Sequence, residues 1–296
     1  MASLKDIRSK IESTKNTQQI TRAMKMVSAA KLRRAQQNIV NLRPYANGLL
    51  SVIADIAETN RLEHPLLSVT LEPKKVLVVV LTSDRGLCGG FNTNACKAAE
   101  RYYRANKPVL EKFDFIFVGR RAIDYFKRRK ITAIENITSL EKVISYTLAA
   151  NLANKLLELY RHGEYDEIKI IYNEFKSAIS QVVVNEKLLP VDVSQARKAS
   201  LEMGAGAHFS KDMIFEPAPE LIIDQLLNKH FATQVYRTMS ESVASEHGAR
   251  MTAMENATKN AGEMINLYTL MYNKLRQASI TTELIEITSG AEALKS

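Results

Sequence analysis

Two long stretches with almost no helix-breaking residues dominate the sequence, one at each end of the chain. Between Leu4 and about residue 57 the first glycine is Gly48 and the only proline is Pro44, and good helix formers such as Ala, Gln, Lys, Arg and Met are frequent. Between Leu221 and about Ile287 there is no proline. At 1.5 Å per residue the two helices would be roughly 80 and 100 Å long. Because a usual globular helix is several times shorter, each of these must pack lengthwise against a partner.

Both stretches carry the 4-3 residue spacing that keeps one stripe of a helix against another helix. In the first stretch the stripe consists of Leu4, Ile7, Ile11, Thr14, Gln18, Thr21, Lys25, Ser28, Leu32, Ala35, Ile39 and Leu42. In the second it consists of Val243, His247, Arg250, Met254, Ala257, Ala261, Met264, Tyr268, Met271, Leu275 and Ala278. The first helix runs toward the central part of the chain and the last runs away from it, so a pair of them must be antiparallel. The first stripe is polar in its middle, where Ile20, Met24 and Val27 form a second apolar stripe that is expected to meet something else.

The net charge of +9 is concentrated near the N-terminus. Residues 1–43 hold ten Lys or Arg against two acidic residues, whereas residues 211–296 hold eight basic against eleven acidic residues. Opposite charge favours pairing of the two helices, although salt screens it beyond about 10 Å. An acidic protein partner and a nucleic acid both explain the basic helix. The usual RNA-binding signatures are absent, so a nucleic-acid binder is the second hypothesis, and it predicts affinity that falls steeply with salt.

The central part of the sequence alternates predicted strands and helices. Strands are predicted at residues 75–82, 113–118, 167–172 and 181–184, and helices at 92–106, 122–129 and 140–161. Such alternation is typical of a mostly parallel sheet with helices on its faces. The predicted fold class is α/β, with a long antiparallel two-helix coiled coil from the N- and C-terminal segments and a central Rossmann-like domain. The predicted parts are 1–57 (first long helix), 58–74 (linker), 75–210 (central domain) and 211–296 (last long helix).

The segment most like an enzyme site is the glycine-rich turn at residues 82–92, which follows the first predicted strand and precedes a helix. Nucleotide phosphates bind at such turns. However, the sequence has neither G-x-x-x-x-G-K-[ST] nor G-x-G-x-x-G with a suitably spaced acidic residue. Glycines that allow a tight turn are therefore the favoured interpretation. A nucleotide-binding enzyme is the third hypothesis, and it requires measurable nucleotide affinity in the isolated chain.

No other catalytic or metal site is predicted. Cys88 and Cys96 lack zinc-site spacing, and Cys88 is expected to be a buried structural residue even though Arg85 is close in sequence. The five histidines are scattered. The longest apolar run has six residues, at 76–81, which is too short for a transmembrane helix. We expect no catalytic residue, cofactor or metal, and the scarcity of cysteine favours a reducing compartment.

Four segments form a set in a fixed order along the chain. They are ITRAMKMV at 20–27, extending to Arg34; DRGLCGGFN at 84–92; SEHGARM at 245–251 with AMENAT at 253–258; and RQASITTEL at 276–284 with SGA at 289–291. Together they resemble the signatures of the gamma subunits of F-type ATP synthases. The resemblance spans residues 20 to 291. It implies a non-catalytic central-stalk rotor that couples ion-driven rotation to conformational changes at the catalytic beta subunits.

The resemblance also implies partners and contact residues. The partners would be a hexamer of alpha and beta subunits, the epsilon subunit and the membrane c-ring, with no nucleic acid and with membrane contact only through partners. Residues that match beta-contacting positions of the family are Arg22, Lys25, Lys31, Arg33 and Arg34 in the first helix, and Arg250, Arg276, Gln277, Thr281 and Glu283 in the last. Stabilisation within or between the two helices is the alternative role for each of them. The start without a presequence predicts a bacterial protein, peripheral on the cytoplasmic face of the plasma membrane.

Overall fold

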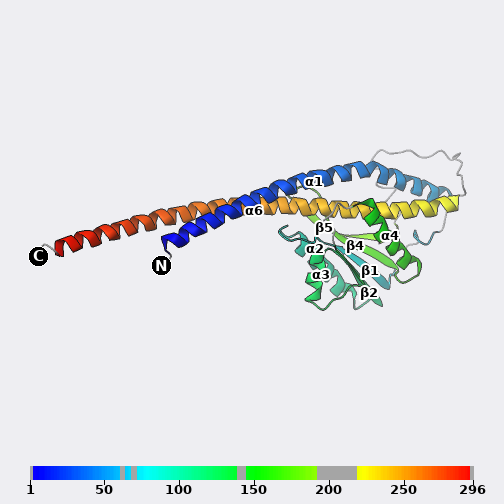
Figure 1. Cartoon of the computed structure of the whole chain (residues 1–296). Helices are drawn as coiled ribbons and strands as arrows, with labels where there is room; N and C mark the ends of the chain where they lie inside the picture. Colours follow the sequence, from blue (N-terminus) through cyan, green and yellow to red (C-terminus); the bar gives the residue numbers. More distant parts are fainter. Residues whose placement is uncertain (1–2, 61–63, 68–71, 139–144, 192–218, 294–296) are drawn as a thin grey trace. The chain divides into compact units, whose positions relative to one another are not determined.

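The computed structural model describes residues 3–60, 64–67, 72–138, 145–191 and 219–293. Helix α1 covers Leu4–Asn60 and helix α6 covers Pro219–Ala293, with 57 and 75 residues, which confirms the two long helices (Figure 1). The elements between them are β1 (Lys75–Leu81), α2 (Phe91–Asn106), β2 (Lys112–Val118), α3 (Arg120–Lys127), β3 (Glu135–Ile137), α4 (Tyr146–Arg161), β4 (Glu167–Phe175) and β5 (Gln181–Leu189). The chain divides into two compact units. One unit is Met1–Ser28 with Arg250–Ser296, and the other is Ala29–Ala249.

The larger unit is built on a five-stranded sheet in the order β3-β2-β1-β4-β5. Strand β1 lies at the centre and pairs in parallel with β2 and β4, with Val79 opposite Ile116 on one side and Ile170 on the other. Strand β3 is also parallel to its neighbour, whereas β5 is antiparallel to β4. The predicted mostly parallel sheet is therefore confirmed. The prediction missed β3, which has three residues and no apolar run.

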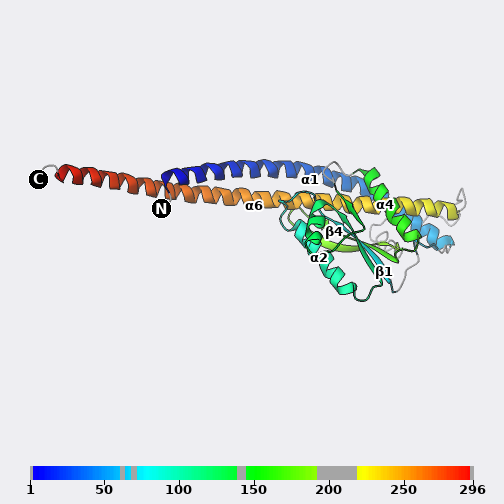
Figure 2. The same cartoon turned by 60° about the horizontal axis from the view of Figure 1, so that its bottom comes forward.

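Both faces of this sheet are covered by helices (Figure 2). On one face, alternate strand residues such as Leu77 and Ile170 pack with α4 and with the parts of α1 and α6 that belong to this unit. On the other face, Val78 and Phe117 pack with α2 and α3, and the Phe117 and Phe126 rings stack with centroids 4.6 Å apart. Because β1 is buried on both faces, its sequence is a continuous apolar run rather than an alternating one.

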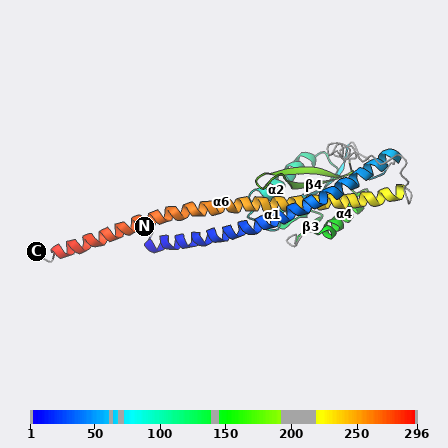
Figure 3. The same ribbon diagram turned by 90° about the horizontal axis from the view of Figure 1, so that it is seen from above.

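The smaller unit is an antiparallel helix pair. Residue pairs in contact across it are Lys25 with Glu255, Thr21 with Thr258, and Gln18 with Gly262. The residue number falls on one helix as it rises on the other, which confirms the predicted antiparallel arrangement. Figure 3 shows the first part of α1 lying beside α6 in this unit.

Several boundaries differ from the prediction. Helix α3 begins and ends two residues earlier than predicted, and strand β4 continues to Phe175. Helix α4, predicted from residue 140, is described from Tyr146, where Ser145 Oγ caps it by accepting a hydrogen bond from Leu148 N at 3.3 Å. Strand β5, predicted to end at residue 184, continues to Leu189. Residues 139–144 and 192–218, which include part of the predicted helix and of the central domain, lie outside the described residues.

Candidate functional site

The seam of the helix pair is polar in its middle, as the spacing predicts. Thr258 Oγ1 donates to Thr21 Oγ1 at 2.8 Å, and Gln18 Nε2 donates to the Thr258 carbonyl at 3.5 Å. Lys25 Nζ forms an ion pair with Glu255 at 2.7 Å. A Cβ at Gly262 would lie 3.1 Å from Gln18 Nε2, which is the flexible end of that side chain. Few apolar side chains are buried in this part of the seam, and hydrophobic burial therefore stabilises the pair only weakly.

Large apolar side chains instead lie on the outer surface of the same unit. On α1, Ile20, Met26 and Val27 are all more than half exposed. On α6 the exposed apolar residues are Met264, Leu267, Leu270, Met271, Ile280, Leu284, Ile285 and Ile287. The predicted seam stripe is therefore wrong at Met264 and Met271. The half-buried residues there are Ile265, Tyr268 and Tyr272, because the 3.6-residue helical repeat drifts away from a strict 4-3 spacing. Scattered exposed apolar residues are ordinary, but a concentration of them along two helices marks a surface that a partner covers. The predicted second stripe is confirmed at Ile20 and Val27, whereas Met24 is only partly exposed.

The basic residues predicted on α1 are mostly exposed. Arg22 lies in the smaller unit, whereas Lys31, Arg33 and Arg34 lie in the part of α1 that belongs to the larger unit. Lys25 differs, since it forms the ion pair with Glu255 and therefore has a role within the helix pair. An exposed pair of this kind contributes little stability and leaves the lysine available to a partner.

The residues predicted near the end of α6 are also exposed. Arg276, Gln277, Thr281 and Glu283 lie on a stretch in which most side chains face solvent. Thr281 Oγ1 donates to the Gln277 carbonyl at 2.9 Å, and Glu283 accepts a hydrogen bond from Ser279 Oγ at 3.2 Å. Both contacts lie within α6, one helical turn apart, so the side chains remain accessible to a partner subunit.

Arg250 differs from the rest of the set because it is only 9% exposed. A contact between Arg250 and another subunit stays a prediction, as it does for the other nine residues.

Side chains of the glycine-rich turn after β1 form hydrogen bonds within the turn and to the start of α3. Asn92 Oδ1 accepts a hydrogen bond from Ser83 N at 2.9 Å, and Asp84 Oδ1 accepts one from Arg120 N at 2.9 Å. The side chain of Cys88 is buried, as expected, and Asn92 Nδ2 lies 3.1 Å from its sulfur. These contacts support the structural interpretation of the turn.

The adjoining backbone explains one required glycine. Gly119 ends β2 with a φ of +98°, and a Cβ there would lie 2.2 Å from the Thr82 carbonyl oxygen. Only glycine allows the chain after β2 to pass so close to the end of β1.

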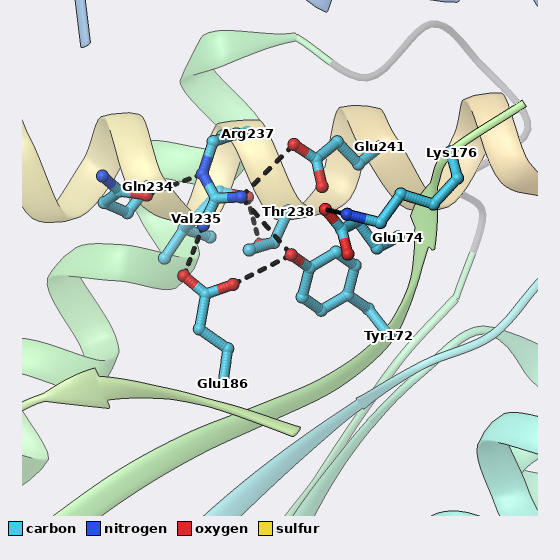
Figure 4. Close-up of polar contacts among 9 residues, drawn as sticks. All are labelled: Tyr172, Glu174, Lys176, Glu186, Gln234, Val235, Arg237, Thr238 and Glu241. Atoms are coloured by element: carbon cyan, nitrogen blue, oxygen red, sulfur yellow. Dashed lines mark hydrogen bonds and ion pairs between the residues drawn. The ribbon is translucent and has the colours of Figure 1, made fainter. Parts of the chain in front are cut away.

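A partly buried ionic cluster on α6 was not predicted from the sequence (Figure 4). The Arg237 guanidinium donates to Glu186 on β5, to the Tyr172 hydroxyl on β4 at 3.3 Å, and to Glu241 one helical turn away at 3.2 Å. Its Nε donates to Gln234 at 2.7 Å, and Tyr172 donates to Glu186 at 2.8 Å. One signal existed in the sequence, because an arginine four residues before a glutamate is a helical ion pair. The strand partners of Arg237 could not be read from it.

The charges in this cluster support one another. Burial disfavours the guanidinium charge, but Glu186, Tyr172 and Glu241 together outweigh this and raise the pKa of Arg237. Burial raises the pKa of the Glu241 carboxyl, and Arg237 opposes that shift. Burial likewise raises the pKa of the Tyr172 hydroxyl. The Tyr172 phenol therefore stays protonated at neutral pH and donates its hydrogen bond to Glu186.

Two further buried groups are chemically quiet. Burial, with Arg237 as a second cause, lowers the pKa of His230 to about 4, so its imidazole is neutral under ordinary conditions. Burial raises the pKa of the Cys96 thiol to about 12, although Arg129 opposes the shift. Such a thiol is not a nucleophile near neutral pH. Among the residues that the structure describes, no group of three or more His, Cys, Asp or Glu could hold a metal ion. No described helix is long and apolar enough to cross a membrane.

Comparisons with known proteins agree over the whole chain. Residues 3–294 match the ATP synthase family model. The chain is 65% identical to the ATP synthase gamma chain of Bdellovibrio bacteriovorus and 47% identical to that of Geobacter sp. strain M21, with all of each chain covered. It is similar to a chain in the Euglena gracilis mitochondrial ATP synthase structure of OSCP, F1 and c-ring (TM-score 0.67, 25% identity, covering 98% of this chain and 94% of that one). It is also similar to a chain in the Tetrahymena thermophila central stalk and c-ring structure (TM-score 0.61, 29% identity, covering 80% and 99%). The chain therefore belongs to the family of ATP synthase gamma chains.

Proposed function

We propose that the chain is the central-stalk rotor subunit of an ATP synthase and has no catalytic site of its own. The observation that carries this proposal is the antiparallel helix pair with a polar seam and exposed apolar outer faces, in a member of this family. Because its seam buries few apolar side chains, such a pair is only weakly stable alone. Its exposed apolar side chains are suited to contact with surrounding subunits. The similar solved structures, which are of a central stalk with c-ring and of an OSCP, F1 and c-ring assembly, support the same role.

Family membership and the exposed residues of the two long helices support the following partners. A hexamer of alpha and beta subunits surrounds the helix pair, and its beta subunits contact Arg22, Lys25, Arg276, Gln277, Thr281 and Glu283, and also Lys31, Arg33, Arg34 and Arg250. The epsilon subunit and the c-ring bind the larger unit, residues 29–249, which contains the sheet and is called the sheet unit from here on. The chain contacts no nucleic acid and reaches the membrane only through partners. It is peripheral, and we place it on the cytoplasmic face of a bacterial plasma membrane.

The mechanism is mechanical rather than chemical. A helix pair has no threefold symmetry, so three surrounding beta subunits cannot have the same surroundings at one time. Rotation of the chain presents each beta subunit with each face of the pair in turn, and this changes the conformations of the catalytic sites. Basic side chains on α1 act on acidic partner groups over a distance and with salt sensitivity, whereas hydrogen bonds from Arg276 or Gln277 act only at one angle.

The composition of the native complex tests the proposed function. The chain is purified with an N-terminal tag from its own cells, and the intact complex is weighed by native mass spectrometry. We expect one copy of the chain with three alpha and three beta subunits. Recovery of the chain alone or with RNA would contradict the proposal, and it would direct attention to the basic face of α1 as a nucleic-acid surface.

A further inference from the structure

Besides its apolar packing on the sheet, helix α6 meets the β4–β5 hairpin of the larger unit at two places on one of its faces. The two places are Arg237 and Gly248, which are eleven residues apart. At 100° per residue, eleven residues bring the helix back to within about 20° of its starting direction, and they advance it by about 16 Å. Both residues therefore point to the same side of α6, three turns apart.

The contact at Arg237 is directional. Its guanidinium reaches acceptors on two different strands, Glu186 on β5 and Tyr172 on β4, and the strand groups are themselves joined by a hydrogen bond (Figure 4). Guanidinium donors lie in a rigid plane, so these contacts are lost together when the helix rolls by a small angle. Gln234 and Glu241 hold the guanidinium from its own helix, which keeps the side chain extended toward the sheet.

The contact at Gly248 is one of close approach. A Cβ at Gly248 would lie 3.2 Å from the carbonyl oxygen of Ala178, in the turn between β4 and β5. Gln181 Nε2 donates to the same carbonyl at 3.1 Å and holds the turn in place. The helix backbone thus rests on the tip of the same two strands that Arg237 grips further along.

Apolar burial could hold α6 on the sheet without either contact, because a large hydrophobic cluster covers this face. Hydrophobic attraction is non-directional, however, and resists rolling of a helix less well than it resists separation. A partly buried ion pair contributes little net stability but does fix geometry. The ionic cluster around Arg237 is thus better suited to fixing the orientation of α6 than to adding stability.

We propose that Arg237 and Gly248 form a two-point torsional lock between α6 and the β4–β5 hairpin, through which torque passes between the sheet unit and the long helix. This inference rests on the rotor function proposed above. It assigns Arg237, Glu186, Tyr172 and Gly248 as positioning residues for energy coupling. All four residues lie on β4, β5 or the part of α6 in the larger unit, so their removal should leave ATP hydrolysis itself intact.

The test separates orientation from stability. The assembled complex is prepared with the paired change Arg237→Met and Glu186→Leu, which replaces the ion pair by apolar side chains of similar size. Ion pumping per ATP hydrolysed is measured in vesicles against a rising opposing gradient, together with the melting temperature of the complex. The variant also removes the partners of Glu241 and Tyr172, so the melting temperature serves to choose conditions in which the complex is intact. There we expect near-normal pumping without load and at least about a twofold loss of pumping per ATP at high load.

Matched variants control for the loss of any ion pair. The pair Lys155→Met and Glu135→Leu removes a 2.7 Å ion pair between α4 and β3 that does not involve α6, and it should pump normally under load. Arg237→Lys keeps the charge but not the planar donors, and it should show the load-dependent loss. If only the charge at residue 237 matters, Arg237→Lys should instead pump normally under load, and that result would overturn the proposal.

A second route covers the case in which the paired variant fails to assemble. Gly248→Ala should give the same load-dependent loss, whereas Gly262→Ala meets only the flexible end of Gln18 at 3.1 Å and should not. Normal pumping under load by the Arg237 pair or by Gly248→Ala would refute the lock. The proposed rotor function is tested separately with the unchanged chain. It is supported if the purified complex contains the chain and pumps ions, and it fails if the complex does not contain the chain.

Discussion

The acid sensitivity of the sheet unit should depend on one histidine. His230 lies on α6 with 3% of its surface exposed, and its Nδ1 has no hydrogen-bond partner within the part of the chain that the structure describes. Burial and, secondarily, Arg237 lower its pKa from 6.5 to about 4. Between pH 6.5 and about 4, the unfolded chain therefore binds a proton at His230 that the folded unit does not bind.

The sign and size of the effect follow from proton linkage. The folded-state pKa is depressed, so the contribution of neutral His230 to stability is fully present above pH 6.5 and is lost as pH falls from 6.5 to about 4. At about 1.4 kcal/mol for each unit between the two pKa values, the loss is about 2 kcal/mol at pH 5 and about 3 kcal/mol at pH 4. The raised pKa of Glu241 works in the opposite direction. A comparison with a variant at residue 230 cancels that contribution.

The assay is urea unfolding of the full chain between pH 7 and pH 4, followed by tyrosine fluorescence, since the chain has eleven Tyr and no Trp. Amide exchange of β1 and β4 identifies the transition of the sheet unit. The difference in unfolding free energy between the unchanged chain and His230→Asn should fall by about 2 kcal/mol from pH 7 to pH 5. His162→Asn, which removes an exposed imidazole on the C-terminal end of α4, is the matched control. Parallel pH curves for the unchanged chain and His230→Asn would refute the reasoning.

Four further predictions follow from the helix pair and the sheet. Gly119→Ala should destabilise the sheet unit by more than about 2 kcal/mol, because of its left-handed φ and the carbonyl beside it, and a near-unchanged urea midpoint would contradict this. Lys25→Ala should cost less than about 1 kcal/mol, since its pair with Glu255 is exposed, and a double-mutant cycle measures that coupling. Amides of residues 14–28 should exchange quickly in the free chain and slowly in the assembled complex, so equal protection in both would count against the polar-seam argument. Truncation after Leu275 should lower assembly or coupling more than it lowers nucleotide binding by beta, and unchanged ATP synthesis would sink the role given to the end of α6.

The long helices could be predicted because their information is local. The 4-3 stripe predicted Ile7, Thr21, Ser28 and Leu32 as seam residues, and the structure buries all four. Helix propensity and stripe spacing are properties of neighbouring residues, and a polar seam residue is recognised by its register alone. The central strand β1 was predicted for the same reason, since its apolar run is continuous.

The rest depends on partners that are distant in sequence. Strand β3 forms because the edge of β2 offers it hydrogen bonds, and its residues Glu135–Ile137 carry no strand pattern of their own. The Arg237 cluster joins residues that are more than fifty positions apart, and register within the sheet decides that Glu186 and Tyr172 meet the guanidinium. A sequence pattern indicates one helix face or one strand, but not which face of a helix meets which edge of a sheet.

The most direct test of the account is to watch the chain turn. A probe is attached through Ile179→Cys, at a side chain of the β4–β5 turn that is 81% exposed, the complex is fixed to a surface through its beta subunits, and ATP is supplied. If the chain is the rotor, the probe should rotate in one direction and pause at three equivalent angles per turn, one for each beta subunit. ATP hydrolysis by a complex in which the probe stays still would contradict the central claim.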